Sequence, residues 1–309
     1  MTSLFDILAP VLVLIALGYA LARGGAITPA GEAGIANVVF FATTPALLFR
    51  AMAGTELPGW RDAGVLVAYF VPALAVYAGW VAIATVLRGR GWASAGIGAM
   101  GACFGNTVLL GIPIVERAFG APGLRVLVLI VSIHSAIFFT LTTLLAEADR
   151  GRARIRDTVL ATARTMARNA IVLAIFGGAL WRLTGMPLWA PLDGALALLG
   201  GATIPLALIA VGSGLAAFRL GEGAGGLGAI TFVKLAGLPA LVWLVAAPGL
   251  GLDATTVAVA TIAAALPVGT NVYVIARRYG VDESAVAGAI LVSTLASAAT
   301  VPVLIALLR

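Results

Sequence analysis

The sequence predicts an all-α polytopic membrane protein in which ten transmembrane helices form two inverted five-helix repeats. Of its 309 residues, 61% are hydrophobic and 10% are charged, and the mean hydropathy is +1.10. Soluble domains are about 45–50% apolar and about 25% charged. A globule of this size cannot hide so much apolar surface, and disordered chains have the opposite composition. The composition therefore excludes an ordinary soluble enzyme and a disordered protein.

Ten apolar segments are long enough to cross a hydrocarbon core of about 30 Å, which takes about 20 residues of helix. The expected spans are about 5–22, 33–52, 64–87, 94–118, 122–146, 169–185, 190–217, 225–247, 254–278 and 283–308. Their apolar runs are continuous, whereas the strands of a transmembrane β-barrel alternate in segments of about 10 residues. The opening MTSLFDILAP has no basic region before its apolar run, which favours a retained first helix over a removed signal.

The basic residues predict the orientation. The segments after the odd-numbered spans contain 12 arginines, the opposite side contains 6, and Lys234 lies inside the eighth span. This bias places the odd-numbered loops, including the basic loop 147–168, in the cytoplasm and both termini outside the cytoplasmic membrane. We expect that loop to be solvated rather than bound to anionic lipid. Topology thus accounts for the basic composition, and no nucleic-acid partner is expected.

The basic loop also divides the chain into two blocks of five spans, 1–146 and 169–309. Because five is odd, a duplicated block must re-enter the membrane with the opposite orientation, which gives an inverted repeat. Pro45 in the second span of the first block and Pro205 in the second span of the other block lie in similar small and polar surroundings. These two prolines are expected to be structural counterparts.

The fourth span of each block is interrupted near its centre. The interrupting residues are Gly105, Asn106, Gly111 and Pro113 in 94–118, and Pro267, Gly269 and Asn271 in 254–278. Glycine and proline disrupt helical geometry, and irregular backbone at membrane depth is tolerated only where it lines protein or water. Each break would expose a half-helix N-terminus, which suits an anion. Single prolines and asparagines often only kink or join helices, but paired breaks favour a binding site.

Three segments of the sequence are distinctive: FGNTVLLGIPIVERAFG, IPLALIAVGSGLA and AALPVGTNVYVIARRYGVD. They resemble the auxin efflux carrier family, which includes the plant PIN-formed carriers and bacterial proteins described as malonate or organic-acid permeases. The resemblance implies that spans 1, 2, 6 and 7 form a scaffold and that spans 3–5 and 8–10 form a mobile transport domain. It also implies that spans 4 and 9 cross as broken helices, as in bile-acid sodium symporters, and that the chain dimerises through its scaffold.

The same resemblance suggests roles for individual residues. Asn106 falls on the family's crossover asparagine and Pro267 on the crossover proline of the ninth span. Gly105 stands where the plant carriers have a proline. His134 stands where they have a glutamine that faces the substrate. The long central loop of the plant carriers is missing here, so auxin itself is not implied.

The remaining polar residues bear on energy coupling. All 13 acidic residues lie at span ends or in loops on these boundaries, which argues against cation/proton antiport. His134, near the middle of the fifth span, could couple protons or bind an anion, or could simply be a satisfied polar contact. Lys234 could attract the substrate, reach a carbonyl or pair with the scaffold. Ser293 and Ser297 share one face of the tenth span and either line the site or allow close packing.

These observations predict a secondary transporter that moves a small organic anion, such as an auxin-like carboxylate or a dicarboxylate, by an elevator-type movement. A sodium-coupled symporter of the bile-acid type and a non-transporting membrane sensor are the alternatives. One cysteine, Cys103, one histidine and no carboxylate at mid-membrane depth leave no catalytic dyad, so an enzyme is not expected. No metal or cofactor is expected beyond a coupling ion, which is either a proton or sodium.

Overall fold

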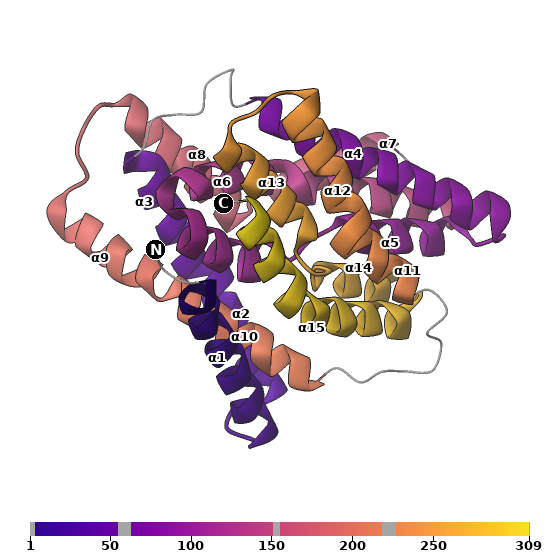
Figure 1. Ribbon diagram of the computed structural model, residues 1–309, viewed down its shortest axis with the longest axis horizontal. Helices are drawn as coiled ribbons and strands as arrows, with labels where there is room; N and C mark the ends of the chain where they lie inside the picture. The colour runs from indigo at the N-terminus through magenta and orange to yellow at the C-terminus, as the bar shows by residue number, and fades with distance from the viewer. Residues whose placement is uncertain (1–3, 55–62, 151–154, 218–226, 309) are drawn as a thin grey trace. The chain divides into compact units, whose positions relative to one another are not determined.

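The structure is a computed structural model that describes residues 4–54, 63–150, 155–217 and 227–308 (Figure 1). In these ranges the chain is helical and contains no strand beyond one isolated β-bridge. The expectation of an all-α protein is therefore confirmed. Some basic residues used for the orientation, Arg61, Arg152, Arg154, Arg219 and Arg309, lie outside the described residues, and the orientation stays a prediction.

Within the described ranges, six helical stretches are long and apolar enough to cross a membrane: Pro29–Gly54, Ala63–Leu87, Thr107–Asp149, Ala190–Ala216, Gly228–Gly249 and Glu283–Leu308. Three further apolar helices are shorter: Leu12–Arg23, Ala170–Leu183 and Ala254–Ala265. The stretch Thr107–Asp149 includes Gly120, whose φ of 61° and ψ of −154° are not helical. The expected fourth and fifth spans therefore join at a kink, because glycine adopts a positive φ without the steric cost of a Cβ.

The helices fall into two compact units, and the first comprises residues 4–54, 108–132 and 166–217 of the described chain. Its elements are α1 (Leu4–Arg23), α2 (Pro29–Val38), η1 (Val39–Thr43), α3 (Thr44–Gly54), the first part of α6 (Ile112–Asp149), α8 (Ala170–Leu183), α9 (Ala190–Gly201) and α10 (Thr203–Ala217). Figure 1 shows α1 beside α10. A Cβ on Gly212 would clash with the carbonyl oxygen of Ile15. Glycine is needed here because the two backbones touch, as is common between membrane helices.

The second unit comprises residues 63–107, 133–150, 155–165 and 227–308 of the described chain. Its elements are α4 (Ala63–Ala82), η3 (Ile83–Leu87), α5 (Trp92–Cys103), the last part of α6, α7 (Ile155–Met166), α11 (Leu227–Phe232), η6 (Val233–Gly237), α12 (Leu238–Leu244), η7 (Val245–Gly249), α13 (Ala254–Ala265), α14 (Asn271–Tyr279) and α15 (Glu283–Leu308). Helix α13 is buried between α12, α15 and α4, and α5 packs against α4 and α14. All residues discussed below at the helix breaks belong to this unit.

Two features of the structure bear on the expected organisation, which stays a prediction. The second half of the fourth span and the start of the fifth, residues 108–132, group with the first unit rather than with the rest of their spans. The basic segment 147–168 contains the helix α7 instead of being a loop throughout. Asp157 in its first turn and Arg164 in its last turn complement the helix dipole, which explains why a polar segment can be helical.

In two of the π-helical turns, η1 and η6, a single residue separates the end of the turn from a proline. Pro45 follows the residue after η1, and Pro239 follows the residue after η6. Proline has no N–H to donate to the preceding turn, so the backbone widens. In η6 the amide of Leu238 accordingly donates to the carbonyl of Val233, five residues back.

Candidate functional site at the paired helix breaks

The first break follows α5. Phe104 has φ −81° and ψ 108°, which is extended, and its amide donates to Met100 O as the last bond of the helix. Gly105 and Asn106 continue the non-helical backbone, and the chain becomes helical again in η4 (Thr107–Gly111). The break thus lies at 104–106. Gly111 and Pro113, which were also expected to interrupt this span, are buried inside the continuing helix of η4 and α6.

The second break follows α13. Leu266, the residue before Pro267, has φ −61° and ψ 149°. This geometry is expected, because a proline ring clashes with a helical conformation of the residue before it. Helix resumes at Asn271, the first residue of α14. Asn271 and Thr270 are exposed, whereas residues 257–269 are all buried.

The two breaks pair with one another. The amide of Asn106 donates to Pro267 O and the amide of Gly269 donates to Phe104 O, each at 2.9 Å. Gly105 and Val268 form an antiparallel β-bridge between these bonds. The two breaks thereby supply partners for each other's main-chain groups, which buried backbone requires. The end of α5, the end of α13 and the start of α14 consequently lie close together within the second unit.

Several of the predicted site residues gather at this pairing. Asn106 is 9% exposed and Ser293 of α15 is fully buried. The Ser293 hydroxyl accepts a hydrogen bond from the amide of Val268 at 3.1 Å and donates to Ile290 O at 3.2 Å. Lys234 is fully buried, and its Nζ lies 3.3 Å from where a Cβ of Gly105 would be. Helix ends, an amide, a hydroxyl and an ammonium therefore lie together.

His134 lies beside the first break in an aromatic cluster. Its ring stacks on Phe104 with 4.4 Å between ring centroids, and Phe70 and Phe138 also pack against it. The Nε2 atom is 3.2 Å from the hydroxyl of Tyr69, while Nδ1 has no hydrogen-bond partner of normal geometry in the described part of the chain. The His134 side chain is 1% exposed, and it contacts the first break through the stacked ring of Phe104.

Pro45 and Pro205 are not at the paired breaks. They belong to the first unit, near the starts of α3 and α10. The threonines close to them, Thr43, Thr44 and Thr203, are buried and their hydroxyls have no hydrogen-bond partner among the described residues. Within the same limits, no group of three or more His, Cys, Asp or Glu side chains could hold a metal ion.

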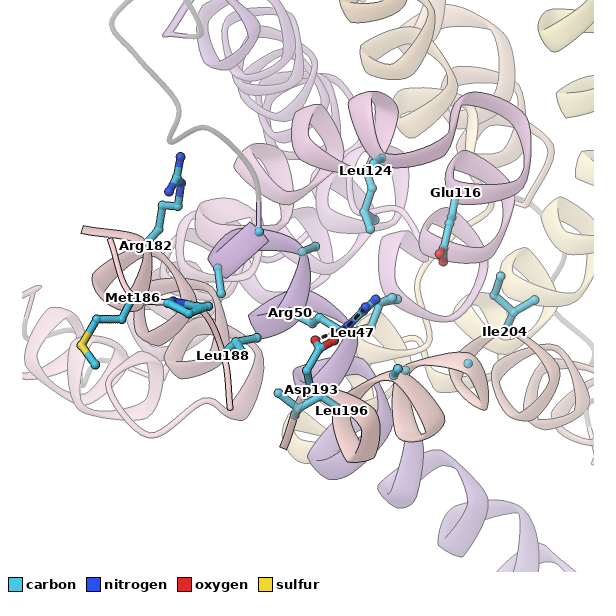
Figure 2. A pocket seen from close by; sticks show the side chains of 18 of the residues that line it. Leu47, Arg50, Glu116, Leu124, Arg182, Met186, Leu188, Asp193, Leu196 and Ile204 are labelled. Carbon is cyan, nitrogen blue, oxygen red and sulfur yellow. Dashed lines mark hydrogen bonds and ion pairs between the residues drawn. The ribbon is translucent and has the colours of Figure 1, made fainter. Parts of the chain in front are cut away.

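Sequence reasoning did not identify a pocket of about 890 Å³ within the first unit (Figure 2). Arg50 of α3 and Asp193 of α9 form a two-contact ion pair in it, at 2.6 and 3.2 Å. Glu116 and Leu124 of α6 also line this pocket, as does Arg182 of α8. The only signal in the sequence was a pair of opposite charges at the ends of two expected spans. The pocket is lined by both acidic and basic side chains, and the charge of Arg50 is paired with that of Asp193.

Tyr69 and Phe104 were also missed. Phe104 stands directly before Gly105 in the FGNT segment, so an aromatic side chain next to a break was a usable signal. Tyr69 lies 65 residues from His134 in the sequence, and nothing in its local pattern distinguishes it from other aromatic residues of α4. Only the packing of the helices brings its hydroxyl to the histidine.

Comparison with known proteins gives two matches over essentially the whole chain. Residues 3–305 match the family model described as "Membrane transport protein". The chain is also 30% identical over 312 residues to a protein of Rhizobium meliloti (strain 1021) named "Putative malonate transporter", with 100% of this chain and 97% of that protein covered. The chain therefore belongs to the membrane transport protein family of auxin efflux carriers.

Proposed function

We propose that this protein is a secondary transporter that carries a small organic anion across the cytoplasmic membrane and binds it at the paired helix breaks. The observation that carries the proposal is the reciprocal pairing of Phe104–Asn106 with Pro267–Gly269. Transporters commonly bind substrates where discontinuous helices meet, because half-helix N-termini present free N–H groups and a positive dipole end to an anion.

The chemistry at the breaks suits a carboxylate. Asn106 immediately precedes the helix that starts with η4, and Asn271 is the exposed first residue of α14. The first N–H groups of a helix have no partner within the helix, and an asparagine amide can donate further bonds. The name of the relative makes malonate the first substrate to test. One of its carboxylates could bind at Asn106 and the other at the start of α14.

The movement that we propose is of the elevator type, with ten transmembrane helices arranged as two inverted repeats. The second unit, which contains the paired breaks, is the moving body, and the scaffold of spans 1, 2, 6 and 7 belongs to the first unit. A homodimer through this scaffold would keep it fixed in the membrane while the other unit moves. The buried His134 is the proposed proton-coupling residue, since histidine changes its charge near neutral pH.

The direct test is uptake of radiolabelled malonate by proteoliposomes that contain the purified protein. We expect Asn106→Ala to weaken malonate binding by about tenfold or more, since a hydrogen bond to a charged group is worth about 1.5–3 kcal/mol. Asn37→Ala is the matched control, because Asn37 is an exposed asparagine of α2. Absence of malonate and other carboxylate uptake by the wild type, or equal binding by both variants, would contradict the proposal.

A further inference from the structure

Lys234 is the only lysine among the 19 basic residues of the chain. It lies in the π-helical turn η6, and none of its side chain is exposed. Burial of a charged group costs a large free energy unless other groups compensate it. Such a residue in a membrane-spanning segment therefore needs a specific reason, and π-helical turns frequently mark functional positions.

The compensation comes from main-chain carbonyls. The Lys234 ammonium donates a hydrogen bond to the carbonyl of Ala264, the next-to-last residue of α13. The last carbonyls of a helix have no partner within the helix and carry the negative end of its dipole. The ion pairs formed within the described residues are Arg50–Asp193 and Arg90–Asp282, so no described carboxylate neutralises Lys234.

Gly105 leaves the space that the ammonium needs. A Cβ at this position would lie 3.3 Å from Lys234 Nζ and 3.2 Å from the carbonyl oxygen of Ala263. The ammonium therefore lies beside the first break and the C-terminal carbonyls of α13 at the same time. A side chain at position 105 would be in tight contact with the Lys234 ammonium and with the carbonyl oxygen of Ala263.

Unwound carbonyls and half-helix C-terminal ends are the groups that coordinate sodium in transporters with broken helices. A lysine ammonium is a compact point charge, unlike the planar guanidinium of arginine, which is the basic side chain everywhere else in this chain. We propose that the Lys234 ammonium is a tethered cation in the place where a coupling sodium ion would bind, so that the protein binds its organic anion without sodium.

The Lys234 ammonium should also strengthen anion binding at the proposed site. This part of the inference rests on the proposed function. Lys234 Nζ lies next to Gly105, and Gly105 is bonded to Asn106. Inside a protein, where the effective dielectric constant is far lower than in water, a fixed positive charge strongly favours a nearby anion. Because the amine is covalently attached, it occupies this place whether or not sodium is available on either side of the membrane.

The first experiment uses no substrate and measures the thermal unfolding midpoint of the purified protein by tryptophan fluorescence. We expect wild-type midpoints in sodium chloride and in choline chloride of equal ionic strength to agree. Lys234→Ala, which opens a space at the carbonyls, should unfold at lower temperature and regain part of the loss in n-propylammonium chloride. Lys234→Met also removes the charge but fills the space, so it should be destabilised without regaining stability in the amine salt.

The second experiment measures malonate binding by calorimetry in the same two salts. Wild-type affinity should be the same in both, and Lys234→Met should bind about tenfold to a hundredfold more weakly. Wild-type binding or thermal stability that requires sodium would overturn the inference, as would wild-type behaviour of Lys234→Met in both experiments. If the wild type binds no carboxylate in either salt, the proposed function fails, and the thermal experiment still decides whether Lys234 replaces a cation.

Discussion

The main-chain N–H of Val268 is hydrogen-bonded to the hydroxyl of Ser293, so that α15 holds the second helix break at its middle residue. Val268 is also the residue that bridges to Gly105 of the first break. One serine thereby fixes the position of both breaks. Because Val268 is fully buried, its amide has no water to bond with when this hydroxyl is removed.

Ser293→Ala should therefore destabilise the protein. An unsatisfied buried donor costs about 1–3 kcal/mol, and we expect the free energy of unfolding to fall by that amount. Ser297→Ala is the matched control, since the Ser297 hydroxyl bonds only to Thr294 O of its own helix in the described structure. Thermal unfolding of both variants measures the difference, and equal midpoints would show that the bond to Val268 is dispensable.

Gly269→Ala should disrupt the pairing of the breaks. A Cβ here would lie 2.6 Å from Phe104 Cδ1 and 3.1 Å from Gly105 O. Phe104 cannot easily move away, because its ring stacks on His134. Overpacking of this kind typically costs about 1–3 kcal/mol, and we expect that loss of stability together with loss of uptake.

Gly79→Ala provides the comparison for this change. Gly79 is an exposed residue of α4, and a Cβ there would meet nothing within 4 Å. Alanine is favoured over glycine inside a helix by up to about 1 kcal/mol, so this variant should be as stable as the wild type or more so. A similar loss in both glycine variants would mean that close packing at Gly269 is not the cause.

Asp253 caps the N-terminus of α13 and gives the fold a pH dependence. Its carboxylate accepts bonds from the amide of Thr256 at 3.0 Å and from the Thr256 hydroxyl at 2.6 Å. Partial burial opposes ionisation, but the bonds from Thr256 and from the main-chain amides of Asp253 and Thr255 together outweigh it and hold the pKa of Asp253 below its usual value. Because the folded pKa is depressed, this stabilisation is fully present above the ordinary aspartate pKa of about 3.9 and is lost as the pH falls through the folded pKa.

Asp253→Ala should accordingly lower the free energy of unfolding by about 1 kcal/mol at neutral pH, the usual effect of removing an N-cap. The difference from the wild type should shrink as the solution is acidified below about pH 4, where the wild-type carboxylate also becomes protonated. Denaturation curves at a series of pH values measure this difference. A constant difference down to the lowest pH would contradict the role of the charge.

The helices themselves could be predicted because their signal is local. The segment expected at 283–308 is the helix Glu283–Leu308, and the expected span 64–87 corresponds to Ala63–Leu87. Continuous apolar runs of the right length define such helices without reference to the rest of the chain. The proline before the second break likewise constrains Leu266 locally.

The contacts across the second unit were not predictable in the same way. Tyr69 and His134 are brought together only when α4 packs beside α6, and residues 108–132 group with the first unit only through tertiary packing. The place of the first break was also ambiguous, because glycines and a proline at several positions could each have caused it. The structure has the break at 104–106, where Gly269 packs so closely against Phe104 that a larger residue at position 269 would not fit.

The pair formed by His134 and Tyr69 makes the last prediction, which concerns transport. His134→Gln keeps a hydrogen-bonding side chain beside the Tyr69 hydroxyl but cannot change its charge, whereas histidine ordinarily does so between about pH 5 and 8. We expect malonate uptake by the wild type to vary with pH and uptake by His134→Gln to be independent of pH. A variant that keeps the wild-type pH profile would exclude His134 as the coupling residue.

Two tyrosines of α4 separate this role from a merely structural one. Tyr69→Phe removes the hydroxyl 3.2 Å from His134 Nε2, and Tyr77→Phe removes a hydroxyl 3.0 Å from Thr142 Oγ1, two turns further along the same helix. Both changes delete one buried hydrogen bond, so both should cost about 1 kcal/mol of stability. Only Tyr69→Phe should shift the pH profile of uptake, because only Tyr69 contacts the side chain that we expect to carry the proton.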